Sequence, residues 1–258
     1  MMPIIFIGHG SPMNAIEDNE YTEKWQKIAA SMPKPEAILA VSAHWFVAHT
    51  RVLTAQNPRT IHDFYGFPDA LQNVQYKAIG APKLAYETKD LLGEHVLSDD
   101  TWGLDHGTWS VLRVMYPEAD IPMYQISIDQ GASAEEHFAM GAKLKALREK
   151  NVLIVGSGNV VHNLSLIDFS MSGGYDWAYA FDKFIKNNIE NRTFENVINY
   201  HQAGESAKHA FYTPEHFYPL LYVLGGVEKG DELKIYNESC MGGSLSMTSY
   251  VFYPPVNK

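Results

Sequence analysis

The stretch PIIFIGHGSP, residues 3–12, reads as a buried strand that runs directly into a tight turn. Its consecutive apolar residues, Ile4 to Ile7, are typical of a strand that is covered on both faces. Glycines on either side of His9 then predict a turn that displays a single imidazole. Comparable apolar runs occur at residues 36–43 (EAILAVSA), 121–128 (IPMYQISI) and 151–158 (NVLIVGSG). The sequence therefore predicts a sheet built on buried strands.

Helical segments separate these strands, which favours an α/β fold with helices on the faces of the sheet. Residues 133–151 begin with Ser133 and Glu136 at the spacing of a capping box. No repeat or shift in composition marks a boundary, so we expect one domain over residues 1–258. Residues 20–31 place four apolar side chains on one helical face: Tyr21, Trp25, Ile28 and Ala29.

The C-terminal third contains two further predicted elements. Residues 213–226 (TPEHFYPLLYVLGG) predict a helix that ends at Gly225 and that Pro219 kinks or shortens. Residues 244–253 (SLSMTSYVFY) alternate between polar and apolar, which indicates a more exposed and antiparallel strand.

The composition excludes several classes of function. The chain has 258 residues and a net charge of −10. It lacks the lysine and arginine clusters that bind phosphates, so we expect neither nucleic acid nor an anionic membrane as a partner. Its first residues lack a basic region, and no apolar run approaches the length of a membrane span. We therefore expect a soluble cytoplasmic protein.

Histidine is the unusual residue of this sequence, with eleven copies. His9 follows the first strand, His44 follows residues 36–43 directly, and His162 comes shortly after residues 151–158. Open α/β sheets bind ligands beyond the carboxyl ends of their strands, so these three side chains are expected to meet there. His106 and His216 lie at loop-to-helix junctions that are able to reach the same edge.

We interpret these histidines as a metal site. Neutral imidazole suits zinc, iron, copper and nickel, and the single Cys240 rules out a thiolate cluster. Three histidines with open coordination positions fit a catalytic zinc or a non-haem Fe(II). Glu215 and Asp105 adjoin two of the histidines and are either ligands or residues that orient imidazoles. An acid at the position of Glu215 equally stabilises a helix dipole.

The remaining histidines are assigned less sharply. His62 lies in IHDFYGFP, residues 61–68, where Asp63, Tyr65 and Phe67 either line an aromatic-binding pocket or form a compact loop. The others are expected to be structural: His49, His95, His137, His201 and His209.

Several segments together resemble the class III extradiol ring-cleaving dioxygenases (LigB-like), in their DOPA 4,5-dioxygenase branch. The resemblance runs through nearly the whole chain in order, so it is specific. The segments are FIGHGSPMNAIEDNEYTEKW, VSAHWF, IHDFYGFP, WGLDHGTWSVL, IPMYQISID, SGNVVHNL and TPEHFYPLLYVLG.

The resemblance implies a single-domain α/β fold with a central mixed sheet and helices on both faces. It also implies a mononuclear metal, Fe(II) in the active enzyme, at a site that Zn(II) is also able to occupy. His9, His44 and His216 carry over as ligands, and His162 as a fourth ligand in a resting zinc form. In the wider class the third ligand is a carboxylate; here Glu215 stands beside His216, and we predict His216.

The resemblance further implies that a catechol such as L-DOPA and dioxygen are the reactants. His162 and His106 are the predicted catalytic residues, with His162 taking the catechol proton because imidazole titrates near neutrality. Asp105 is expected to orient His106, and substrate-binding roles are predicted for His62, Tyr65 and Asp105.

Two other functions are also compatible with the sequence. A histidine-rich open site also activates water, which would make the protein a zinc-dependent hydrolase. A catalytically silent, metal-dependent aromatic-binding protein is the other alternative. We expect a monomer or a small homo-oligomer in each case.

Overall fold

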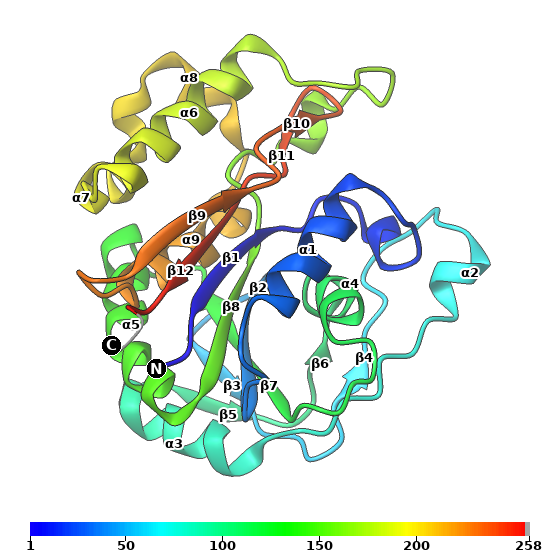
Figure 1. Cartoon of the computed structure of the whole chain (residues 1–258), viewed down its shortest axis with the longest axis vertical. Coiled ribbons are helices and arrows are strands. Elements are labelled where there is room, and N and C mark those ends of the chain that lie inside the picture. Colours follow the sequence, from blue (N-terminus) through cyan, green and yellow to red (C-terminus); the bar gives the residue numbers. More distant parts are fainter. Residues whose placement is uncertain (256–258) are drawn as a thin grey trace.

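The computed structural model describes residues 1–255, which form a mixed eight-stranded sheet with helices packed against it (Figure 1). The strand order across the sheet is β5-β3-β7-β2-β8-β1-β12-β9. In chain order these strands are β1 (Ile4–Gly8), β2 (Ala37–Val47), β3 (Arg51–Leu53), β5 (Leu97–Asp99), β7 (Met123–Asp129), β8 (Val152–Gly158), β9 (Glu232–Tyr236) and β12 (Ser249–Tyr253). Two short pairs lie outside it: β4 (Arg59–Thr60) with β6 (Gly103–Leu104), and β10 (Cys240–Met241) with β11 (Leu245–Ser246).

The centre of the sheet is parallel, β3 and β12 run antiparallel to it, and β5 at one end pairs in parallel with β3. Strands β7, β2, β8 and β1 pair in parallel in that order. Strand β3 is antiparallel to β7, and β12 is antiparallel to both of its neighbours. Parallel neighbours need long crossover connections, and helices supply them here. The predicted α/β class with a central mixed sheet is confirmed.

Helices cover both faces of the sheet, as predicted (Figure 1). Helices α1 (Glu20–Ala30) and α4 (His106–Met115) pack on one face, where Trp25 and Leu112 share a core cluster with Ile5 and Ile7. The opposite face carries α3 (Pro82–Leu92), α5 (Ala134–Leu144) and α9 (Tyr218–Gly225). The remaining helices are α2 (Asp69–Gln72), α6 (Asp176–Glu190), α7 (Phe194–Ile198) and α8 (Glu205–Ala210).

Local signals in the sequence account for several of these elements. The four apolar runs form β1, β2, β7 and β8, and residues 20–31 form α1. At the start of α5, Glu136 N–H donates to Ser133 Oγ (3.3 Å) and Ser133 N–H donates to the Glu136 carboxylate (2.6 Å). The predicted capping box is therefore confirmed. Residues 256–258 of the predicted domain lie outside the described residues.

The C-terminal third matches its prediction in part: the helix ends at Gly225 and is shortened, as expected, whereas the following strand is more buried than expected. A 3-10 turn (Pro214–His216) precedes α9, which begins at Tyr218 with Pro219 in its first turn. Proline needs no N–H partner there, so it shortens the predicted helix rather than kinking it. The antiparallel direction of β12 is confirmed, but its predicted exposure is wrong. Val251 and Phe252 are buried because each enters one of the two core clusters.

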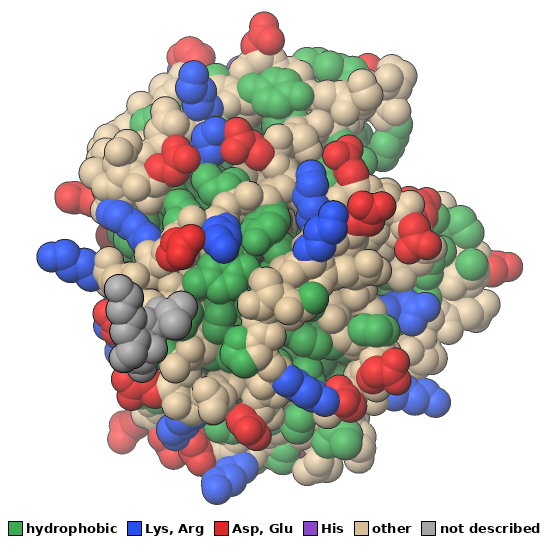
Figure 2. Space-filling view, in the orientation of Figure 1, with side chains coloured by type: hydrophobic (Ala, Val, Ile, Leu, Met, Phe, Trp, Pro, Cys, Tyr) green, Lys and Arg blue, Asp and Glu red, His purple; other side chains and the backbone are tan. Residues whose placement is uncertain are grey.

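The surface agrees with the charge pattern of the sequence. On the described part of the face in Figure 2, lysines and arginines are interspersed with acidic side chains and do not gather into one patch. Within residues 1–255, no helix combines the length and apolar character needed to span a membrane.

Candidate metal centre

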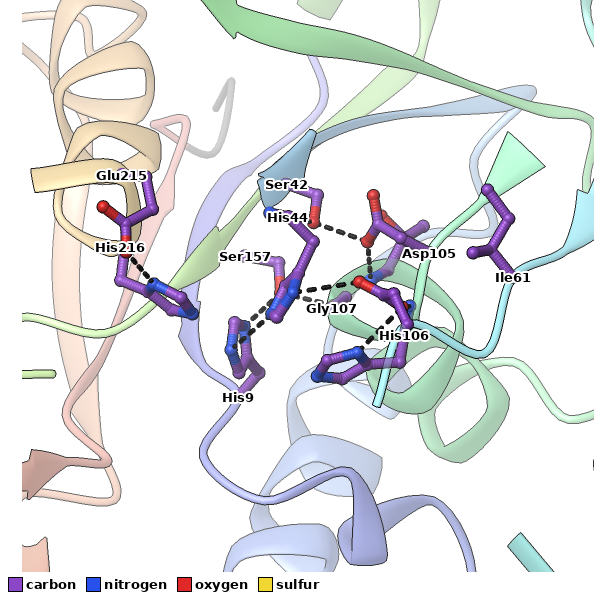
Figure 3. Close-up of polar contacts among 12 residues, drawn as sticks. His9, Ser42, His44, Ile61, Asp105, His106, Gly107, Ser157, Glu215 and His216 are labelled. Carbon is purple, nitrogen blue, oxygen red and sulfur yellow. Dashed lines mark hydrogen bonds and ion pairs between the residues drawn. The ribbon is translucent and has the colours of Figure 1, made fainter. Parts of the chain in front are cut away.

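Four histidines converge at one edge of the sheet, where the parallel strands end (Figure 3). His9 directly follows β1, and His216 closes the 3-10 turn before α9. His44 was expected just after its strand, but it lies inside β2. The register between β2 and β7 shifts between Val41 and Phe46, so His44 occupies an irregular part of the strand.

Three of these imidazoles are close enough to share one ion. A ring nitrogen from each of His9, His44 and His216 lies within 4.8 Å of the other two. The Nε2 atoms of His9 and His44 are 3.4 Å apart, and the ring of His216 is centred 5.0 Å from that of His44. The structure thus brings together the three residues predicted as ligands.

Hydrogen bonds at Nδ1 fix the orientation of two of these rings. The Ser157 hydroxyl donates its proton to the carbonyl of Gly107, so its oxygen accepts from His9 Nδ1–H at 2.9 Å. His216 Nδ1 lies 3.0 Å from Oε1 of Glu215, and its Nε2 is buried without a partner. Nε2 of His9 and Nε2 of His216 therefore each carry a lone pair that is available to a metal ion.

Asp63 holds the ring of His44 and also that of His106. Its Oδ2 lies 3.0 Å from His44 Nδ1, and its Oδ1 lies 2.9 Å from His106 Nδ1. In the sequence, Asp63 is only one residue of a loop that was expected either to line an aromatic-binding pocket or to be a compact loop. Its partners are distant in sequence, so no local pattern could have identified this contact.

Asp105 was expected to orient His106, but its carboxylate binds other groups. Its buried carboxylate caps α4 by accepting from Thr108 N–H (3.2 Å), and it also accepts from Ser42 Oγ (2.6 Å) and the Gln125 amide. Asp63 makes the bond to His106 that was predicted for Asp105, because α4 turns the capping carboxylate toward its own amides.

His162 and His106 complete the histidine cluster. The His162 ring stacks on that of His216, with centroids 3.4 Å apart and planes 4° apart. The His106 ring is centred 3.9 Å from that of His44. Both side chains line the cavity beside the three predicted ligands, where they are able to exchange protons with a molecule bound there.

Burial sets most of the pKa values in this cluster. Burial and the neighbouring imidazoles lower the pKa of His9 and of His216 well below its usual range. The same causes lower the pKa of His162 to about 3. Metal ions bind neutral imidazole, so these shifts suit ligands. The pKa of His44 is raised instead: burial is the largest single effect and lowers it, but the Asp63 hydrogen bond and the nearby carboxylate charges of Asp63, Asp105 and Glu215 together outweigh burial.

The donor set fits a first-row transition metal ion. It consists of imidazole nitrogens whose other ring nitrogen is hydrogen-bonded, the usual arrangement of histidine ligands. The buried, unpartnered Nε2 of His216 is the clearest sign, because an orphaned polar atom in this position costs free energy that an ion recovers. Zinc and Fe(II) both accept such ligands.

A cavity of about 400 Å³ opens over the three rings. Tyr65, 95% exposed, and Phe169, 84% exposed, lie at its rim. Tyr65 therefore lies where a substrate-binding role was predicted, but His62 and Asp105 are not among the described residues that line the cavity. His62 Nε2 instead bonds the carbonyl of Val74 at 2.8 Å. The lining residues are His9, Gly10, Ser11, Pro12, His44, Asp63, Phe64, Tyr65, Phe67, His106, His162, Leu164, Ile167, Phe169, His216 and Leu245.

Comparison with known proteins shows similarity over nearly the whole chain. The family described as the catalytic LigB subunit of aromatic ring-opening dioxygenase matches residues 3–253. A 4,5-DOPA dioxygenase extradiol from Escherichia coli (strain K12) is 46% identical over 257 residues, covering 96% of this chain and 93% of the relative. One from Beta vulgaris is 38% identical over 255 residues, covering 96% and 95%. The crystal structure of an uncharacterized protein from Escherichia coli K12 has a TM-score of 0.84 and 42% identity, covering 97% of this chain and 99% of that one.

Proposed function

This chain belongs to the family of the catalytic LigB subunit of aromatic ring-opening dioxygenases and is an extradiol ring-cleaving dioxygenase, and we propose that its reaction takes place at the histidine cluster. We propose that it opens the ring of a catechol such as L-DOPA with dioxygen, using one divalent metal ion held by His9, His44 and His216. The observation that carries the proposal is the convergence of these three imidazoles at the floor of a cavity.

Fe(II) is the proposed metal of the active enzyme, and Zn(II) is able to fill the same ligands. When bound, the ion supplies a Lewis acid for the catechol oxygens and, as Fe(II), the redox chemistry that dioxygen requires. Glu215 is proposed to orient His216 through the hydrogen bond at Nδ1 (3.0 Å). His162 is the proposed fourth ligand of a resting zinc form, because it stacks directly on His216.

The residues of the chain supply binding and proton transfer. His162 is neutral at neutral pH, so one of its ring nitrogens is free to take a proton from a catechol hydroxyl and to return it later. His106 is proposed to hydrogen-bond the substrate from the opposite part of the cavity. Apolar side chains such as Phe64 and Phe67 surround the ring and exclude water from the reacting atoms.

Oxygen uptake tests the proposal. Protein reconstituted with Fe(II) without air and then given L-DOPA and air is expected to consume one dioxygen per catechol and to form a yellow product. Zinc-loaded protein is the control and is expected to stay colourless, because zinc has no accessible redox change. Hydrolysis of an ester or amide by protein that leaves a panel of catechols intact would contradict the proposal.

A further inference from the structure

Both carboxylate oxygens of Asp63 accept hydrogen bonds from the histidine cluster. Oδ2 accepts from Nδ1–H of His44 at 3.0 Å. Oδ1 accepts twice from His106, at 2.9 Å from its ring Nδ1 and at 2.9 Å from its backbone N–H. A carboxylate is only an acceptor, so each ring must carry its proton on Nδ1.

The two Nε2 atoms that result face the centre of the site. Nε2 of His44 lies 3.4 Å from Nε2 of His9, where the proposed ion binds. His106 lines the cavity that receives the substrate. We infer that Asp63 is a positioning residue that fixes the tautomers of a metal ligand and of a substrate-facing histidine together. This inference rests on the proposed function, because it assigns the proposed ion to His44 Nε2.

Replacing Asp63 with asparagine separates the two contacts. An amide has a single acceptor oxygen, whereas the carboxylate has two. The backbone N–H of His106 always donates, so the amide oxygen is expected to stay at the Oδ1 position. The amide NH₂ then faces His44 Nδ1, which has to become an acceptor. The His44 proton moves to Nε2, so a metal ion binds this nitrogen only at the cost of moving that proton away again, which weakens binding.

No other described carboxylate takes over this role. Asp105 is near the same rings, but Thr108, Ser42 and Gln125 occupy its oxygens. Glu215 bonds His216. The variant Asp105→Asn is therefore a matched control, since it removes a buried negative charge near the cluster and leaves both contacts of Asp63 in place.

The test uses metal-free protein labelled with ¹⁵N histidine and long-range ¹H–¹⁵N spectra, which report the protonated nitrogen of each ring. Variants His44→Gln and His106→Gln assign the signals. Wild type and Asp105→Asn are expected to show Nδ1–H for both rings. Asp63→Asn is expected to show Nε2–H for His44 and unchanged Nδ1–H for His106. Its zinc affinity, measured against a competing chelator, is expected to fall about 10- to 100-fold.

The outcomes are distinct. If the wild-type spectrum shows the His44 proton on Nε2, the inference is overturned. This result does not depend on whether the Asp63→Asn variant folds. Unchanged His44 tautomer and zinc affinity in folded Asp63→Asn also overturn it. Wild type with the expected tautomers that binds neither zinc nor Fe(II) supports the role of Asp63 in fixing the rings and contradicts the proposed function instead.

Discussion

At the level of single residues, hydrogen bonds determine which ring nitrogen of each histidine is available to bind a metal ion. Ser157, Asp63 and Glu215 occupy Nδ1 of His9, His44 and His216 respectively. The histidines could be predicted from the sequence because each follows or ends a recognisable element. Glu215 could also be predicted as a partner, because it adjoins His216. Asp63 and Ser157 could not, since they act across long sequence separations.

Removing a predicted ligand should remove the metal. His44→Ala and His9→Ala are each expected to lose most bound ion while keeping the fold, because both side chains lie at the edge of the sheet and outside the apolar core. Metal content by mass spectrometry and the circular dichroism spectrum check this. His62→Gln is the control, since His62 bonds Val74 and lies outside the cavity lining. Full metal content in both alanine variants would refute the ligand assignment.

The proposed role of His162 in proton transfer is tested separately from metal binding. His162→Gln is expected to keep metal and bind catechol, yet to lose turnover by a factor on the order of 10² to 10⁴, as is usual for a general acid–base group. Anaerobic catechol binding and kcat measured on the same sample distinguish the two effects. Undiminished kcat would exclude this role, and complete loss of metal would make His162 an essential ligand.

At the scale of elements, three adjacent parallel strands account for the position of the site. Strands β2, β8 and β1 are neighbours, so residues at or beyond their carboxyl ends meet. This could be predicted, because buried apolar runs are visible in the sequence. The irregular part of β2 that contains His44, and the burial of β12, could not, since both depend on neighbouring strands and helices.

Two loops contribute aromatic side chains to the cavity lining, which affects the substrate charge that the site prefers. The segments before α2 and before α6 contribute Tyr65 and Phe169, and of the described residues no lysine or arginine lines the cavity. A carboxylate on the substrate therefore meets no cation beyond the metal, whereas an ammonium group is attracted to aromatic faces. At matched length, dopamine is expected to exceed 3,4-dihydroxyphenylacetate in kcat/KM by about 10-fold, or about 1.4 kcal/mol.

Variants of the rim check this preference. Phe169→Ala is expected to reduce the ratio of kcat/KM for dopamine to kcat/KM for 3,4-dihydroxyphenylacetate. Tyr212→Ala is expected to leave this ratio unchanged, because Tyr212 is 92% exposed and lies outside the cavity lining. A carboxylate substrate that is used better than the amine would show that these loops do not determine specificity.

For the molecule as a whole, composition and the order of the elements were enough to predict the α/β class, and the family resemblance implied the central mixed sheet. Packing between distant segments was not predictable, as the buried Arg148 shows. It joins the N-terminal strand to the turn after α9 by donating to the carbonyls of Met2 and Gly226 and to the Asp231 carboxylate. The cytoplasmic location and the oligomeric state stay predictions.

A buried carboxylate gives overall stability a measurable pH dependence. Burial raises the pKa of Asp182 to about 6, although Ser246 and Thr248 donate hydrogen bonds to it. The folded protein thus binds more protons than the unfolded chain between about pH 4 and pH 6, so this group reduces stability as pH rises through that window. The reduction is about 3 kcal/mol above pH 6.

Chemical unfolding across this pH range checks the effect. Asp182→Asn lacks the titrating group, so its stability relative to wild type is expected to increase from pH 4 to pH 6. A difference between the two proteins that stays constant across the window would rule out the proposed titration.

The fate of the two oxygen atoms of dioxygen distinguishes extradiol ring cleavage from other reactions at this site. Fe(II)-loaded protein is given L-DOPA under ¹⁸O₂, the product is reduced with borohydride at once so that its aldehyde oxygen cannot exchange with water, and its mass is measured. Extradiol cleavage predicts that both atoms of one dioxygen enter the product, one in the new carboxylate and one in the trapped alcohol. An intact ring, or a product whose new oxygen comes only from water, would contradict extradiol cleavage by this protein.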